Sequence, residues 1–190
     1  MQITAAWAAD LARELLQVPL PRRWAHVQGV ARRARSIAAS LGSDAELLEA
    51  AAWVHDIGYL PGLAGTGMHQ LDGARYLRDT ERAPGLLCRL VAHHSCAHIE
   101  AEERGMSEAL HREFEPAPEI LANALTFCDM TTSPDGKPVN VTLRLAEIHQ
   151  RYGPGHLVSR SIRRATPLIL TAVDAISPDH ARYGELSPVR

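Results

Sequence analysis

Residues 53–62 read WVHDIGYLPG, where an apolar helical run ends in a histidine and an aspartate before Gly58 interrupts it. Leu48 and Ala51 lie seven and four positions before His55. This spacing places His55 on the apolar face of a helix and Asp56 on a neighbouring flank. The stretch therefore predicts a core helix that carries polar, metal-binding types of side chain at its end.

The rest of the sequence repeats the helical pattern. Ala, Leu, Arg and Glu dominate at spacings of three and four, and runs of β-branched residues are few. We predict an all-α bundle of about seven helices, over residues 23–41, 44–57, 69–78, 85–103, 118–128, 141–152 and 156–176. At this length the chain fits one domain, residues 1–190, with a motif-bearing core of about 20–132 and C-terminal helices over 141–176 packed on it. Pro and Gly in residues 133–136 predict a type I turn in an exposed loop.

The composition and net charge limit which kinds of partner and which compartment we expect for this protein. A net charge of −2 gives no basic field for nucleic acid or an anionic membrane. Three cysteines without a CxxC pair suit a reducing compartment. The N-terminus has acidic and basic residues among its apolar ones, unlike a signal peptide, so we expect a cytoplasmic protein. Its apolar stripe of Trp7, Leu11 and Leu15 could pack in the core or form a homodimer interface, and both interpretations stay open.

Histidines and aspartates occur where core residues are expected. A single inward histidine is usually a core residue that is hydrogen-bonded to the backbone. A buried carboxylate, however, loses several kcal/mol on leaving water unless it is paired or bound to a cation. A shared cation would remove this cost for the whole set, and imidazole with carboxylate suits Fe, Mn, Zn, Co or Ni. The set comprises His26, His55, Asp56, His69, His94 and Asp129.

Taken together, His26, the HDIG sequence at 55–58, the later histidines and the Asp of CDMTT at 128–132 resemble the HD-domain phosphohydrolase superfamily. The resemblance implies one metal held by His26, His55, Asp56 and Asp129. It also implies a second metal at His69 and His94, with Asp56 bridging the two ions. We expect one or two divalent ions, with Fe or Mn first and Ni, Co, Zn or Mg as alternatives.

The chemistry that this resemblance implies is hydrolysis of a small phosphorylated substrate, a nucleotide or related compound, by metal-activated water. Asp56 is the expected catalytic metal ligand. Asp72 shares a helix face with His69 and could orient or deprotonate the water, or could be a solvated first-turn carboxylate. The candidate substrate-binding residues are Arg23, Arg75 and Thr132; each has an equally simple interpretation as a surface charge or a turn cap.

Tyr59 separates the chain from several branches of the superfamily. Cyclic-dinucleotide phosphodiesterases usually have Lys at this position, and nucleoside monophosphate phosphatases tend to have Glu. The pattern is most similar to the branch that splits symmetrical dinucleoside polyphosphates. Two alternatives remain: an HD-fold diiron oxygenase acting on a small phosphonate or polyol, and a non-catalytic ligand-binding HD module.

Overall fold

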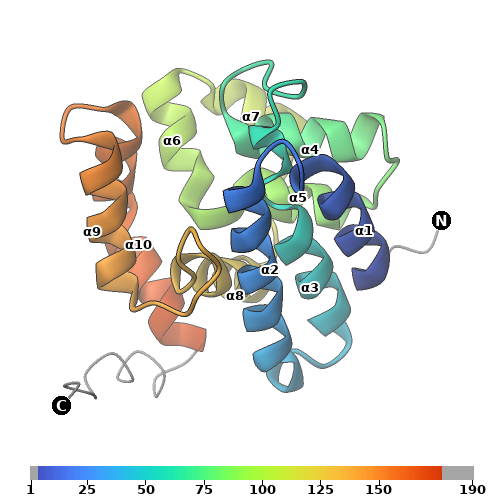
Figure 1. The fold of residues 1–190 in the computed structure, drawn as a ribbon. Coiled ribbons are helices and arrows are strands. Elements are labelled where there is room, and N and C mark those ends of the chain that lie inside the picture. The colour runs from blue at the N-terminus through green and yellow to red at the C-terminus, as the bar shows by residue number, and fades with distance from the viewer. Residues whose placement is uncertain (1–3, 177–190) are drawn as a thin grey trace, which may run out of the picture.

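The computed structural model describes residues 4–176, and every regular element in this range is a helix (Figure 1). The all-α fold class predicted from the sequence is therefore confirmed. The α-helices are α1 Ala5–Leu16, α2 Pro21–Ser36, α3 Ala45–Val54, α4 His69–Asp79, α5 Gly85–His93, α6 Ala97–Arg104, α7 Ser107–Glu113, α8 Glu119–Met130, α9 Val141–Tyr152 and α10 Leu157–Ile176. Short 3-10 turns are η1 Ala38–Ser40, η2 Gly42–Asp44, η3 Ile57–Tyr59 and η4 His94–Cys96.

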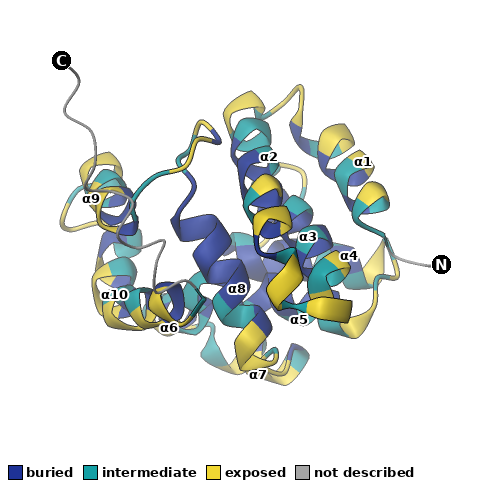
Figure 2. Cartoon of the chain, turned by 90° about the horizontal axis from the view of Figure 1, so that it is seen from below, coloured by how far each residue is buried: buried dark blue, intermediate teal, exposed yellow. Residues whose placement is uncertain are grey.

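Helix α8 occupies the centre of the bundle. Figure 2 shows it in dark blue between α2 and α3 on one side and α9 and α10 on the other. Its residues from Ala124 to Met130 are all buried, and it contacts α2, α3, α5 and α10. A polar residue near the end of this helix, such as Asp129, is therefore held in the interior.

Helix α1 packs against α3 and α2. Its Leu11 is buried, whereas Trp7 and Leu15 pack against the core while partly exposed. Of the two interpretations of the N-terminal stripe, core packing is the one that these contacts support.

The predicted helix over 85–103 is two helices. Ser95 and Cys96 have φ angles of 50° and 61°, and they separate α5 from α6. The left-handed region interrupts a helix, and non-glycine residues enter it at an energetic cost. The structure also contains α7, which the sequence analysis did not predict.

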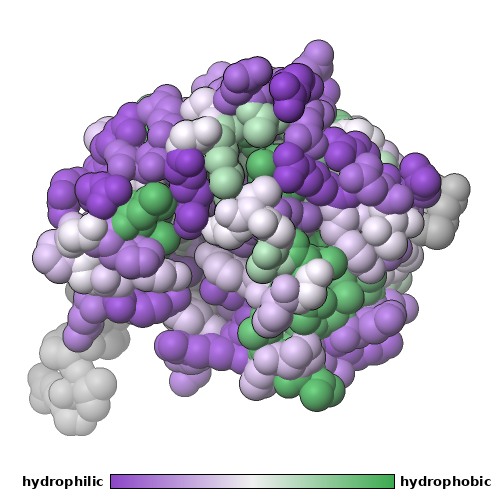
Figure 3. Space-filling model, turned by 90° about the horizontal axis from the view of Figure 1, so that it is seen from above, coloured by the Kyte–Doolittle hydropathy of each residue, from purple (hydrophilic) through white to green (hydrophobic). Residues whose placement is uncertain are grey.

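Most large apolar side chains in the described range are buried or partly buried. Hydrophilic residues cover much of the face in Figure 3, and hydrophobic residues form a limited band on it. The large apolar side chains that remain exposed in the described range are few: Val18, Ile120, Leu143 and Leu168. Between residues 4 and 176, no helix combines the length and the apolar character needed to span a bilayer.

Candidate metal centre

The six side chains that the sequence analysis assigns to a metal meet in the interior of the bundle. They come from α2, the end of α3, the start of α4, the end of α5 and the end of α8. Five are buried and one, His69, is partly buried. Segments distant in sequence thus supply one cluster: His26, His55, Asp56, His69, His94 and Asp129.

Asp56 lies at the middle of this cluster. Its Oδ2 is 3.4 Å from His55 Nε2 and 3.7 Å from His26 Nε2. Its Oδ1 is 3.3 Å from His69 Nε2 and 3.9 Å from His94 Nε2. The two carboxylate oxygens therefore face two different pairs of imidazoles.

Asp129 lies beside the first of these pairs. Its Oδ1 is 3.0 Å from His26 Nε2 and 4.0 Å from His55 Nε2. Its Oδ2 accepts a 2.5 Å hydrogen bond from the hydroxyl of Ser95. The left-handed backbone of Ser95 thus coincides with a contact that orients the distal aspartate.

Backbone carbonyls fix the orientation of three of the imidazoles. The Nδ1 atom of His26 lies 3.0 Å from the carbonyl oxygen of Ser133. The Nδ1 atom of His55 lies 2.9 Å from the carbonyl oxygen of Ala52, and that of His94 lies 2.7 Å from the carbonyl oxygen of Val91. Because a carbonyl oxygen only accepts, each Nδ1 carries a proton, and the other ring nitrogen, Nε2, is turned toward the aspartates.

This arrangement fits a divalent metal. His55 Nε2 is buried without any hydrogen-bond partner among the described residues. His26 Nε2 and Asp129 Oδ1 lie 3.0 Å apart, so a single cation could take both atoms as ligands. Metal-binding histidines usually donate their other ring N–H to a carbonyl or carboxylate, as these Nδ1 atoms do. Two sets of three donors are close enough to share an ion: His26, His55 and Asp129, and His55, Asp56 and His94.

The protonation states favour the same conclusion. Burial by itself would raise the pKa of the Asp56 carboxyl, but the charge of Arg23 opposes burial, and the pKa lies well below its usual range. Burial lowers the pKa of His55, His69 and His94, so these rings are neutral near pH 7. Ionised carboxylate with neutral imidazole is the donor set that transition metals prefer.

Two glycines bring α4 close to the HDIG turn. A Cβ on Gly58 would lie 2.0 Å from the carbonyl oxygen of His69, and one on Gly73 would lie 3.1 Å from the amide nitrogen of Gly58. This close backbone contact holds the start of α4, and with it His69, beside the turn that follows Asp56.

A second close approach holds the loop after Asp129. A Cβ on Gly29 would lie 2.5 Å from the carbonyl oxygen of Gly136, so this loop rests on α2. The amide of Gly136 donates to the carbonyl of Ser133 at 2.9 Å, which is the bond expected of the predicted turn. The contact with α2 holds the carbonyl group of Ser133 next to His26. Gly136 is buried, so the loop that was expected to be exposed is only partly so.

Arg23 and Tyr59 border the cluster. Arg23 Nη1 donates to Asp56 Oδ2 at 2.5 Å, and its guanidinium carbon lies 3.9 Å from the centroid of the Tyr59 ring. Tyr59 also stacks on His69, with the ring centroids 3.9 Å apart. The tyrosine is therefore held between a cation and a histidine of the cluster, and it supports the orientation of both.

The structure does not bring Asp72, Arg75 or Thr132 to the cluster. The Asp72 carboxylate accepts hydrogen bonds from the backbone amides of Thr66 and Gly67, at 3.0 to 3.2 Å. It fixes the loop before α4. Thr132 donates its hydroxyl to the Cys128 carbonyl at 2.7 Å, in the manner of a helix end.

Arg75 also has a partner elsewhere. Its guanidinium donates twice to Glu113, at 2.5 and 3.1 Å. This pair joins α4 to α7, which the sequence analysis did not predict.

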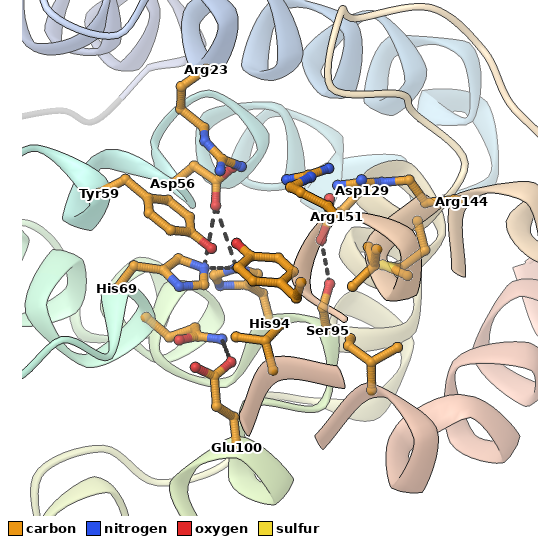
Figure 4. A pocket seen from close by; sticks show the side chains of 16 residues that line it. Arg23, Asp56, Tyr59, His69, His94, Ser95, Glu100, Asp129, Arg144 and Arg151 are labelled. Atoms are coloured by element: carbon orange, nitrogen blue, oxygen red, sulfur yellow. Dashed lines mark hydrogen bonds and ion pairs between the residues drawn. The ribbon is translucent and has the colours of Figure 1, made fainter. Parts of the chain in front are cut away.

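A small cavity of about 70 Å³ lies against the cluster (Figure 4). Asp56, His69, His94 and Asp129 line its inner wall, and Arg23 is also at its edge. Side chains of α9 and α10 complete the lining: Arg144, Ile148, Arg151, Tyr152, Val158 and Ile162. The position of Arg144 on the apolar stripe of Val141, Leu145 and Ile148 is the sequence signal that it lies inside.

Comparison with known proteins identifies the family. A search of the curated proteins and a search of the solved structures found no match. The HD domain family model matches residues 23–132. Because this match spans more than half of the 190 residues and contains all six side chains of the cluster, the chain belongs to the HD domain family.

Proposed function

We propose that the protein is a metal-dependent phosphohydrolase, which cleaves a phosphoester or phosphoanhydride bond of a small nucleotide or related phosphate compound. The observation that carries the proposal is the buried Asp56, 3% exposed, whose two oxygens face two separate pairs of Nε2 atoms. Membership of the HD family supports the same class, because that family is typical of metal-dependent hydrolases.

The residues of the site would have two roles, to hold the metal and to orient its ligands. The four histidines and two aspartates of the cluster would hold the metal. When bound, a divalent ion would lower the pKa of a water molecule and neutralise charge on phosphoryl oxygens. Arg23 orients Asp56 through its 2.5 Å hydrogen bond. Ser95 orients Asp129 in the same way.

The size of the cavities supports a compact substrate. The inner cavity is about 70 Å³, which suits a phosphoryl-sized group. An outer cavity of about 280 Å³ shares Arg23 and Arg151 with it and is also lined by Leu20 and Pro134. This outer volume approaches the lower end, about 300 Å³, of sites that bury small organic ligands. We place the phosphoryl group in the inner cavity and the remainder of the substrate in the outer one.

The test is a screen of protein loaded with Mn²⁺ or Fe²⁺ against nucleotides and simple phosphoesters, with metal content and phosphate release measured in parallel. We expect His55→Ala and Asp56→Ala to lose bound metal and turnover together. His111→Ala, which changes an exposed histidine, is the control and keeps both. Normal metal content in both cluster variants would contradict the proposal. Oxygen consumption by the iron-loaded protein, without phosphate release from any compound, would favour the oxygenase alternative.

A further inference from the structure

One face of α9 points into the inner cavity. Arg144, Ile148 and Arg151 lie three or four residues apart, so they share a helical face, and all three line the cavity. Figure 4 shows both arginines on the same side of the pocket as Asp129. This helix lies outside residues 23–132, which match the family model. Its contribution to the site is therefore a feature of this chain rather than of the matched region.

Arg144 is buried with an incomplete set of partners. The residue is only 6% exposed, and its Nη1 donates to Glu147 Oε2 at 2.5 Å. Its Nε has no acceptor among the described residues. Burying an unsatisfied N–H of a charged group is costly. Because Arg144 also lines the cavity, its guanidinium lies beside any anion that is bound there.

Glu147 contacts the guanidinium groups of both Arg144 and Arg151, but it carries only one negative charge. Arg151 Nε donates to Glu147 Oε1 at 2.8 Å, and Arg144 binds the other oxygen of the same carboxylate. Two positive charges thus share one negative charge at the cavity wall. Because guanidinium forks match the geometry of phosphate oxygens, this pair suits a phosphate-like ligand.

We infer that Arg144 and Arg151 form an anion-binding pair, which holds the phosphoryl group of the substrate against the metal centre. The inference rests on the proposed function and adds to it the residues that recognise the substrate. Glu147 holds the pair in place without ligand and competes with the anion for the same donors. The pair therefore binds a compact tetrahedral anion rather than a neutral molecule.

The test is calorimetric titration of the full chain with inorganic phosphate, with and without Mn²⁺. We expect Arg144→Gln and Arg151→Gln to weaken phosphate binding by about tenfold or more, because each removes a charge-assisted hydrogen bond. Glu147→Gln is the decisive variant: it keeps the side-chain shape but removes the competing charge, so we expect several-fold tighter binding. Arg160→Gln is the matched control, because Arg160 pairs with Glu103 at the surface and does not line the cavity.

The outcomes separate this inference from the proposed function. Phosphate affinity unchanged in Arg151→Gln, or not increased in Glu147→Gln, would overturn the anion-binding pair even if the enzyme hydrolyses phosphoesters. Failure of the wild-type protein to bind metal would instead count against the proposed function, and the titration without Mn²⁺ still judges the pair. Should Arg144→Gln fail to fold, Arg151→Gln decides, since the Arg151 side chain is 29% exposed and its loss leaves Glu147 paired with Arg144.

Discussion

Gly58 lies so close to the first turn of α4 that a Cβ on it would fall 2.0 Å from the carbonyl oxygen of His69. The contact is between two backbones, so no flexible side chain can give way. The HDIG glycine therefore sets how closely the His69 ring approaches Asp56, which it meets at 3.3 Å. Backbone packing and the geometry of the metal centre are coupled at this point.

Gly58→Ala tests this coupling. We expect a loss of about 2 kcal/mol or more in the free energy of unfolding, because the added methyl group forces α4 outward. We also expect weaker metal binding, because His69 moves with α4. Gly62→Ala is the control, since nothing lies within 4 Å of a Cβ there. Urea denaturation and metal titration of the two variants check this, and equal behaviour would disprove the coupling.

The adjacent histidines of α5 and η4 give a matched pair of variants. His94 Nε2 faces Asp56 and His69, whereas His93 Nε2 lies 2.7 Å from the Phe114 carbonyl oxygen, away from the cluster. We expect His94→Ala to lower metal affinity at least about tenfold and His93→Ala to leave it within about twofold. Mass spectrometry of the metal content under equal loading conditions measures both. Equal losses in the two variants would remove His94 from the ligand set.

Asp72 distinguishes a structural carboxylate from a catalytic one. Its oxygens accept from the amides of Thr66 and Gly67, so Asp72→Asn should destabilise this loop by about 1 kcal/mol. We expect kcat to change by less than about threefold, because the side chain does not line the cavity. Asp56→Asn, by contrast, should abolish turnover. If Asp72→Asn lowers kcat as far as Asp56→Asn does, Asp72 is the proton acceptor that the sequence suggested.

Glu113 gives a pH-dependent prediction away from the metal centre. The hydrogen bond from Arg75 lowers the pKa of Glu113. Partial burial of the carboxyl opposes this shift, and the hydrogen bond from Arg78 lowers the pKa further. Because the folded pKa lies below the unfolded one, the stabilisation is fully present above about pH 4.5 and is lost as pH falls through the folded pKa. We therefore expect Glu113→Gln to cost about 1 kcal/mol at pH 7 and less near pH 3. Denaturation at both pH values measures the difference, and a constant difference would refute the ion-pair origin.

The sequence alone predicted the elements whose signals are local. The helix expected over residues 141–152 has these bounds in the structure, where the side chain of Asn140 caps its start by accepting from the amide of Thr142. The histidines and aspartates were recognisable because most lie on apolar helical faces and because their order along the chain resembles the HD-domain pattern; the structure brings them together.

Other features depend on contacts between distant segments, which periodicity does not encode. No Gly or Pro marks the break at Ser95, where a hydrogen bond to Asp129, 34 residues away, accompanies the left-handed backbone. The pairing of Arg75 with Glu113 could not be predicted either, because it requires the orientation of α7 relative to α4.

Ser95 combines an unfavourable backbone conformation with a useful hydroxyl group, and two substitutions separate these effects. Its φ of 50° costs about 1 to 2 kcal/mol for a residue with a Cβ, whereas its Oγ holds Asp129 through a 2.5 Å hydrogen bond. Ser95→Ala removes the hydroxyl and keeps the strain; Ser95→Gly removes both. We expect the glycine variant to be about 1 kcal/mol more stable than the alanine variant, although both bind metal about tenfold more weakly than the wild type. If Ser95→Gly binds metal as tightly as the wild type does, the backbone alone positions Asp129. The reason is that this variant lacks the hydrogen bond to the Asp129 carboxylate and is free of the strain at residue 95.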